Sequence, residues 1–247
     1  MTTTPPIPIT NQQLSILLLL FRFRFLTRLQ IQTILKHKHP SHINKYLKNL
    51  SDNNIIYKHY KKSYPENIKP TLYCLDKKSI NFLNKDGNLN SVLIKRIYKD
   101  KNRSQRFINH SLAIANLFIE TTKQILESKR QLFFYTKTDL FEYDFLIKPF
   151  PDVYLAIEGG KKTDRYFIDI IDYDIPRFVL RNRIKKFIEY FLSNEWQTNT
   201  SYLFPEVLLI CQNDSLVKYL GKFIETTLEN EGSPKINFKV VKTLPLL

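Results

Sequence analysis

The sequence predicts a chain of two parts, a helical part closed by a β-hairpin and a mixed α/β part. Apolar residues recur at helical spacing near the N-terminus, as at Ile43, Leu47 and Leu50. From residue 131 onward, short runs of branched and aromatic residues alternate with helical stretches, which is typical of a mixed sheet. Charge divides similarly: residues 1–110 hold 20 lysines and arginines against 5 acidic residues, whereas residues 111–247 hold 18 of each.

The charge distribution predicts the class of partner. The net charge is +15, and the whole excess lies in residues 1–110. Such asymmetry favours a module that binds a polyanion joined to a neutral module. With 5 glycines, the chain contains neither the dinucleotide-binding nor the ATP-binding glycine pattern.

Cysteine usage and hydropathy indicate the compartment. Cys74 and Cys211 lie far apart and form no metal-binding spacing, which fits a reducing, cytoplasmic setting. The apolar run Ile16–Phe21 is far shorter than the ~18 residues of a membrane span, so we expect a buried helix and no membrane contact.

Three helices are expected in the N-terminal part. The first spans about residues 12–25, and Thr27 is a candidate N-cap for a second helix over about 29–35. The segment His37–Pro40 forms the turn, and a third helix runs from there to about Leu50.

A basic hairpin follows over Ile55–Asp76, with two strands around a turn that contains Pro65 and Asn67. Three helices and such a hairpin make a winged helix-turn-helix, whose third helix enters the major groove and whose wing contacts backbone. The third helix would present five residues to double-stranded DNA: Ser41, His42, Asn44, Lys45 and Lys48. Asn44 could read an adenine, and the lysines could bind guanine or phosphate. Phosphate contacts would come from Arg28 and four wing lysines: Lys58, Lys61, Lys62 and Lys69.

The expected domain boundaries follow from this pattern. Residues 1–84 form the winged helix DNA-binding domain, in which Ser79–Leu83 caps the wing. Residues 85–104 form a basic, helical linker, and residues 105–247 form the α/β domain.

The C-terminal part alternates helices and strands in the order α-β-β-β-α-β-α-β. This order predicts a mixed sheet with helices on both faces, in which the GGKK turn joins the second and third strands as a hairpin. The expected helices span 108–127, 176–192 and 215–229, and the expected strands span 131–136, 153–158, 165–171, 206–212 and 236–242.

Two aspartates stand at neighbouring strands of this sheet. Asp152 opens the second strand and Asp169 lies within the third, so the hairpin brings them together. Period-two alternation puts Asp169 on the same face as Phe167 and Ile171. Since burying an unpaired carboxylate is costly, three explanations for Asp169 are open: a metal, a basic partner, or a place at the edge of the fold.

The αβββαβ order, with Pro-Asp before one strand and an acid in the next, resembles the PD-(D/E)-x-K nuclease superfamily and its restriction-endonuclease-like fold. The whole chain resembles the narrower plasmid replication-relaxation family, which pairs a winged helix with a nuclease-like domain. The resemblance covers about residues 12–212. It rests on RFLTRLQIQTIL, NHSLAIANLF with His110, PDVYL, YFIDIIDYD and RIKKFIEYF.

The resemblance implies a DNA-binding protein of plasmids or mobile elements that acts in replication or DNA relaxation. Asp152 and Asp169 would be catalytic and would bind Mg²⁺, with a lysine assisting. Isoleucine stands at position 171, where the nuclease pattern has lysine, so Lys186 on the next helix is the candidate replacement. Asp169 either shares a metal with Asp152 or pairs with Lys186 or Arg183.

Three functions stay open at this point. One is a DNA-binding protein whose nuclease-like domain lacks a complete catalytic motif and mediates oligomerisation, partner contact or weak DNA processing. The others are an Mg²⁺-dependent DNA endonuclease or nickase, and a winged-helix transcriptional regulator that senses a ligand. Replication or mobilisation proteins and a second copy of the chain are further partners that the resemblance suggests.

Overall fold

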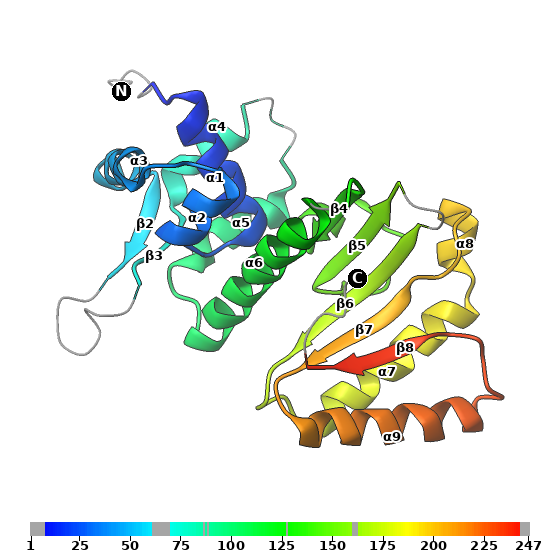
Figure 1. Cartoon of the computed structure of the whole chain (residues 1–247). Helices are drawn as coiled ribbons and strands as arrows, with labels where there is room; N and C mark the ends of the chain where they lie inside the picture. The colour runs from blue at the N-terminus through cyan, green and yellow to red at the C-terminus, as the bar shows by residue number, and fades with distance from the viewer. Residues whose placement is uncertain are drawn as a thin grey trace. The chain divides into compact units, whose positions relative to one another are not determined.

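The computed structural model divides into two compact units, Met1–Ile119 (unit 1) and Glu120–Leu247 (unit 2), shown in Figure 1. None of the helices among the described residues has the length and apolar character that crossing a membrane requires. The structure describes residues 8–60, 70–85, 87, 89–126, 128–159 and 163–242.

Unit 1 begins with three helices and a three-stranded antiparallel sheet of order β1-β3-β2. The predicted helices and hairpin strands are present. Strand β1 was not predicted; it has two residues and forms because β3 lies beside it, with Leu26 opposite Tyr73. The hairpin turn with Pro65 and Asn67 lies outside the described residues. The elements are α1 (Asn11–Phe23), β1 (Leu26–Thr27), α2 (Arg28–Ile34), α3 (Pro40–Asp52), β2 (Ile56–His59) and β3 (Leu72–Leu75).

Local sequence signals start these helices. Thr10 and Gln13 form a capping box at α1, and Thr27 and Gln30 form another at α2, so each threonine is the N-cap of its helix. Helix α3 begins with Pro40, whose missing N–H costs nothing in the first turn. The Gln13 side chain then donates to Asn49 Oδ1 at 2.7 Å and ties α1 to α3.

The segment 85–104, expected as a linker, is part of unit 1. Helix α5 (Ser91–Asp100) buries Leu93 and Ile97, and Arg24 forms a bidentate ion pair with the buried Asp100. The short helix α4 (Ile80–Leu83) precedes it.

Helix α6 (Gln105–Leu126) crosses the division between the units. Its first half belongs to unit 1, where Ile108 packs with Phe25 and Cys74 in a buried cluster. The Gln30 side chain donates to Leu112 O at 3.1 Å and to Asn116 Oδ1 at 2.7 Å. The division therefore lies after Ile119, whereas the sequence suggested residue 105.

Unit 2 contains a five-stranded mixed sheet of order β4-β5-β6-β7-β8. Strands β4, β5 and β6 are antiparallel, and β6, β7 and β8 are parallel. The sheet is therefore mixed, as expected, and the expected hairpin strands are β5 and β6. Gly160, Lys161 and Lys162 of the expected turn lie outside the described residues. The elements are β4 (Gln131–Thr136), η3 (Asp139–Glu142), β5 (Val153–Glu158), β6 (Asp164–Ile171), α7 (Arg177–Leu192), α8 (Glu195–Thr200), β7 (Glu206–Cys211), α9 (Asp214–Asn230) and β8 (Phe238–Val241).

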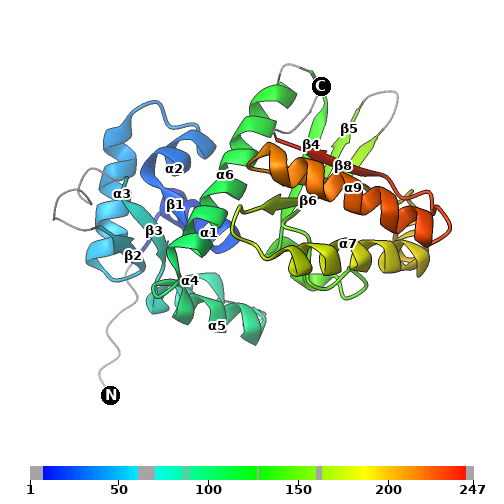
Figure 2. The ribbon, with the colours of Figure 1, turned by 90° about the horizontal axis from the view of Figure 1, so that it is seen from below.

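Helices α7 and α9 lie on the same face of this sheet, as Figure 2 shows. Both connect neighbouring parallel strands, and right-handed crossovers that proceed in one direction place their helices on one side. Phe167 and Val207 of the sheet pack there against Phe187 of α7 and Leu220 of α9. Helices were expected on both faces, whereas α7 and α9 lie on one. The opposite face is also buried, for example at Leu155, and residues 120–126 of α6 belong to this unit.

Candidate functional site

Helix α3 has one buried and one exposed face. Ile43, Leu47 and Leu50 are fully or almost fully buried and hold the helix in unit 1. All five residues that the sequence assigned to the side facing DNA are exposed on the other side: Ser41, His42, Asn44, Lys45 and Lys48.

Of the five predicted phosphate-binding residues, the structure describes Arg28 and Lys58. Arg28 is half-buried and donates from Nη1 to Gln32 Oε1 at 2.6 Å. Lys58 on β2 is exposed, with Nζ 5.1 Å from the ring centre of Tyr60. Lys61, Lys62 and Lys69 lie outside the described residues.

The two aspartates of unit 2 belong to one row across three strands. Because β4 and β5 pair with Thr136 opposite Val153, the next residue, Lys137, stands opposite Asp152. Because β5 and β6 pair with Val153 opposite Ile168, Asp152 stands opposite Asp169. Lys137, Asp152 and Asp169 therefore share the sheet face that α7 covers. The expected proximity of the two aspartates is present.

Asp152 is 4% exposed and has partners on both oxygens. Lys137 Nζ donates to Oδ1 at 2.6 Å, and the backbone N–H of Ile170 donates to Oδ2 at 2.8 Å. Its own backbone N–H donates to Asp169 Oδ1 at 3.0 Å, which couples the two residues directly.

Asp169 pairs with Arg183, one of the two cations considered from the sequence. The guanidinium donates from Nε to Oδ2 at 2.6 Å and from Nη2 to Oδ1 at 3.3 Å. Nη1 of the same group donates to Pro149 O at 2.6 Å, so Arg183 also holds the segment before Asp152. This bidentate pair explains how a strand retains a carboxylate that is 6% exposed.

Lys186, the other candidate, binds elsewhere. Its Nζ donates to Lys148 O at 3.4 Å, one turn of α7 beyond Arg183. The lysine at the carboxylates is Lys137, which the sequence analysis did not single out. It follows a strand directly, and only the register of β4 against β5 reveals that it faces Asp152.

Lys137 stays charged in this setting. Partial burial lowers the pKa of its ammonium group, but attraction to Asp152 and then Asp169 outweighs burial, so the net effect raises the pKa. The cluster thus contains two cations and two anions, and its formal charges cancel.

This arrangement does not fit an Mg²⁺ ion without a change. All four carboxylate oxygens of Asp152 and Asp169 already accept hydrogen bonds, from Lys137, Arg183 and backbone groups. In the described part of the chain, no group of three or more histidine, cysteine or acidic residues is placed to hold a metal. An Mg²⁺ ion would compete with Lys137 and Arg183 for the same carboxylate oxygens.

Comparison with known proteins identifies the family. The model of a family described as replication-relaxation matches residues 17–202, which is more than half of the chain. The chain belongs to the replication-relaxation family. The family match includes the exposed face of α3 and the row that contains Asp152 and Asp169.

The other comparisons add little about this replication-relaxation protein. Among curated proteins none matches. A solved structure, a point mutant of Lactococcus lactis ZitR, is 17% identical over 51% of this chain and 81% of that chain, with a TM-score of 0.28. At that TM-score, the likeness has no bearing on the fold.

Proposed function

We propose that the protein binds double-stranded DNA through α3 and acts in the replication or relaxation of a plasmid or other mobile element. The observation that carries this proposal is the exposed polar and basic face of α3, opposite a face that is fully buried. The family match supports the biological setting.

The order of elements in unit 1 supports a winged helix. The order α1-β1-α2-α3-β2-β3, with a sheet of order β1-β3-β2, supports the assignment of α3 as the recognition helix and of β2 and β3 as the strands of the wing. Asn44 has the amide that pairs with adenine, and Lys45 and Lys48 can bind guanine or phosphate. Arg28 and Lys58 are suited to phosphates at the edges of this surface.

Charge supports the same assignment. Since residues 111–119 carry no charged side chain, unit 1 contains the entire excess of 15 positive charges. This excess attracts the phosphate backbone and makes binding depend on salt, because each neutralised phosphate releases counterions.

For unit 2, we propose a nuclease-like fold that has kept its shape and uses its acids as a structural ion network. The αβββαβ order supports the restriction-endonuclease-like assignment, and the pairing of both carboxylates with cations supports the structural role. An Mg²⁺-dependent endonuclease is the second candidate, because Lys137 lies beside two adjacent carboxylates, as catalysis of that type requires.

Duplex binding by the full chain tests the proposal. We expect Asn44→Ala/Lys45→Ala/Lys48→Ala to weaken binding at least tenfold and to reduce the slope of log K against log salt by about 2. A matched control is Lys218→Ala/Lys222→Ala, two exposed lysines of α9 at similar spacing. Equal losses in both variants, or none in either, would show that α3 is not the DNA-binding surface.

A further inference from the structure

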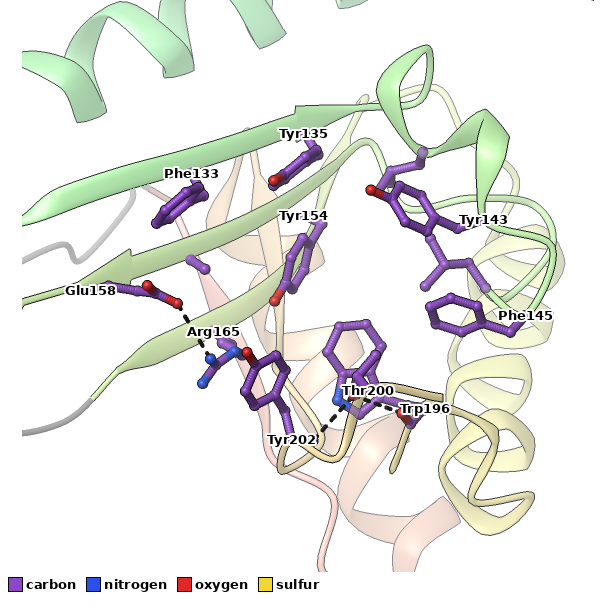
Figure 3. Close-up of a pocket in the computed structure, with 13 residues that line it drawn as sticks. Phe133, Tyr135, Tyr143, Phe145, Tyr154, Glu158, Arg165, Trp196, Thr200 and Tyr202 are labelled. Carbon is purple, nitrogen blue, oxygen red and sulfur yellow. Dashed lines mark hydrogen bonds and ion pairs between the residues drawn. The ribbon is translucent and has the colours of Figure 1, made fainter. Parts of the chain in front are cut away.

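A cavity of about 370 Å³ lies over β4, β5 and β6 of unit 2, on the face that also carries Phe167. Figure 3 shows its aromatic lining, which comes from two strands, from the segment around η3 and from α8 with the residues after it. The volume is near the lower end of ~300–1,000 Å³ for ligand sites, so it suits one small ring system. The principal aromatic residues are Tyr135, Tyr143, Phe145, Tyr154, Trp196 and Tyr202.

One ion pair lies at the edge of this aromatic lining. Arg165 of β6 is within 3.5 Å of Glu158 Oε1, and its guanidinium carbon is 3.7 Å from the ring centre of Tyr202. Figure 3 shows Arg165 between these two residues. Within the described part of the chain, the buried Nε atom of Arg165 has no hydrogen-bond partner, and the 3.5 Å contact of Nη2 with Glu158 is long, so the protein does not use the full donor capacity of this guanidinium.

The ion pair restricts the chemistry of the ligand. Among the described lining residues, Arg165 is the cation and Glu158 the anion, so their charges cancel. A phosphate would find no net positive charge, and an aromatic carboxylate would meet the repulsion of Glu158. A planar ring whose edge presents both donors and acceptors matches Arg165 and Glu158 together, and nucleobases have such edges.

We propose that this pocket binds one unpaired nucleobase of DNA, stacked among the aromatic rings and hydrogen-bonded by Arg165 and Glu158. The inference rests on the proposed function, because it takes DNA as the ligand. It adds a site for single-stranded DNA in unit 2 to the duplex site in unit 1. Stacking on aromatic side chains tolerates every base, because each has a flat face. Burial raises the pKa of Tyr154 to about 12 despite nearby Arg165, so its hydroxyl stays protonated as a further donor.

Tryptophan fluorescence can report binding in this pocket. It contains one tryptophan, Trp196, which is 3% exposed and lines the cavity. The experiment measures tryptophan fluorescence of the full chain during titration with single-stranded hexanucleotides of each base. An abasic hexanucleotide with the same phosphates is the ligand control. We expect the hexanucleotides with bases to quench the fluorescence and the abasic one to leave it unchanged.

Two variants and a matched control locate the binding. Tyr202→Ala removes the ring over Arg165. Glu158→Gln keeps the size of the side chain but removes its charge and exchanges one of its two acceptor oxygens for an NH2 donor. Each variant should weaken quenching at least fivefold. Tyr173→Ala makes the same change at a tyrosine that is 73% exposed and does not line the cavity, and should bind like the wild type. If Tyr202→Ala unfolds, Glu158→Gln alone decides.

Three results would overturn the inference. They are equal quenching by the abasic strand, no quenching by any base, or quenching by 4-hydroxybenzoate without quenching by bases. Duplex binding by the same proteins separates this inference from the proposed function. Retained duplex binding with no quenching would reject only the pocket. Two separate sites predict that the α3 variant Asn44→Ala/Lys45→Ala/Lys48→Ala loses duplex binding and keeps the quenching. Quenching without any duplex binding by the wild type would reject the proposed function and leave the pocket in place.

Discussion

Arg183 of α7 binds Asp169 of β6 through two nitrogens, with Nε 2.6 Å from Oδ2 and Nη2 3.3 Å from Oδ1. Both side chains are largely buried, at 12% and 9% exposure. A buried ion pair is costly to break from one side, because the remaining charge has no counter-ion.

We therefore expect Arg183→Met to lower the free energy of unfolding by about 3–5 kcal/mol. Adding Asp169→Asn should restore part of the loss, since the carboxylate left alone is then neutral. Urea unfolding measures both. Arg181→Met is the control on the same helix, because Arg181 is exposed and donates to Tyr219 OH. Equal effects at positions 181 and 183 would show that the pair is energetically unimportant.

Lys137→Met should destabilise less, by about 1 kcal/mol at pH 7, because the Lys137 side chain is 47% exposed and partly screened. The pKa of Lys137 is raised above the ordinary lysine value of 10.5, so the folded state binds the proton more tightly than the unfolded state. This stabilisation is present below pH 10.5 and is lost as the pH rises through the folded pKa.

Urea unfolding at pH 7 and again above pH 10.5 tests this linkage. The difference between wild type and Lys137→Met should shrink at the higher pH. The comparison variant is Lys218→Met, at an exposed lysine of α9. A difference that grows with pH would mean that Lys137 does not stabilise as a cation.

The end of a stable unit 1 fragment is a further prediction. A fragment of residues 1–104 lacks Phe107 and Ile108, which pack on Phe25, and leaves the Gln30 amide without Leu112 and Asn116. We expect residues 1–126 to unfold cooperatively and residues 1–104 to unfold at a clearly lower temperature. Thermal circular dichroism compares them. The same midpoint for both fragments would show that α6 does not stabilise unit 1.

An assay of binding and nicking on supercoiled plasmid tests whether Asp152 and Asp169 are catalytic. With Mg²⁺ or Mn²⁺ we expect DNA binding without nicking, equal in the wild type and in Asp152→Ala/Asp169→Ala, because the carboxylate oxygens are already bound within the protein. Nicking that the double variant loses would instead favour the endonuclease, with the metal displacing Lys137 or Arg183. Added metal should leave the melting temperature of the wild type unchanged.

Much of the candidate site follows from local patterns. The buried stripe of Ile43, Leu47 and Leu50 determines which side of α3 is exposed, because a helix can bury only one such stripe. A short connection between two strands makes a hairpin, so Asp152 and Asp169 are expected side by side.

Other parts depend on partners distant in sequence. Strand β1 is two residues long and exists because β3 pairs with it. The sequence of helix α5 predicts a basic connector. In the structure, its Asp100 forms an ion pair with Arg24, which is 76 positions away in the chain. The residues around Asp100 do not predict its pairing with Arg24, and the residues around Arg24 do not predict it either.

The sequence alone determined the order of the principal helices and strands, the exposed face of α3 and the adjacency of the two aspartates, because these depend on periodicity and on neighbours along the chain. Only the tertiary structure decided which cations neutralise those aspartates. Lys137 reaches Asp152 through the register of β4 on β5, and Arg183, rather than Lys186, reaches Asp169 through the placement of α7 on the sheet. Both results require contacts between separate elements, and such contacts form only when the whole sheet and its helices pack together.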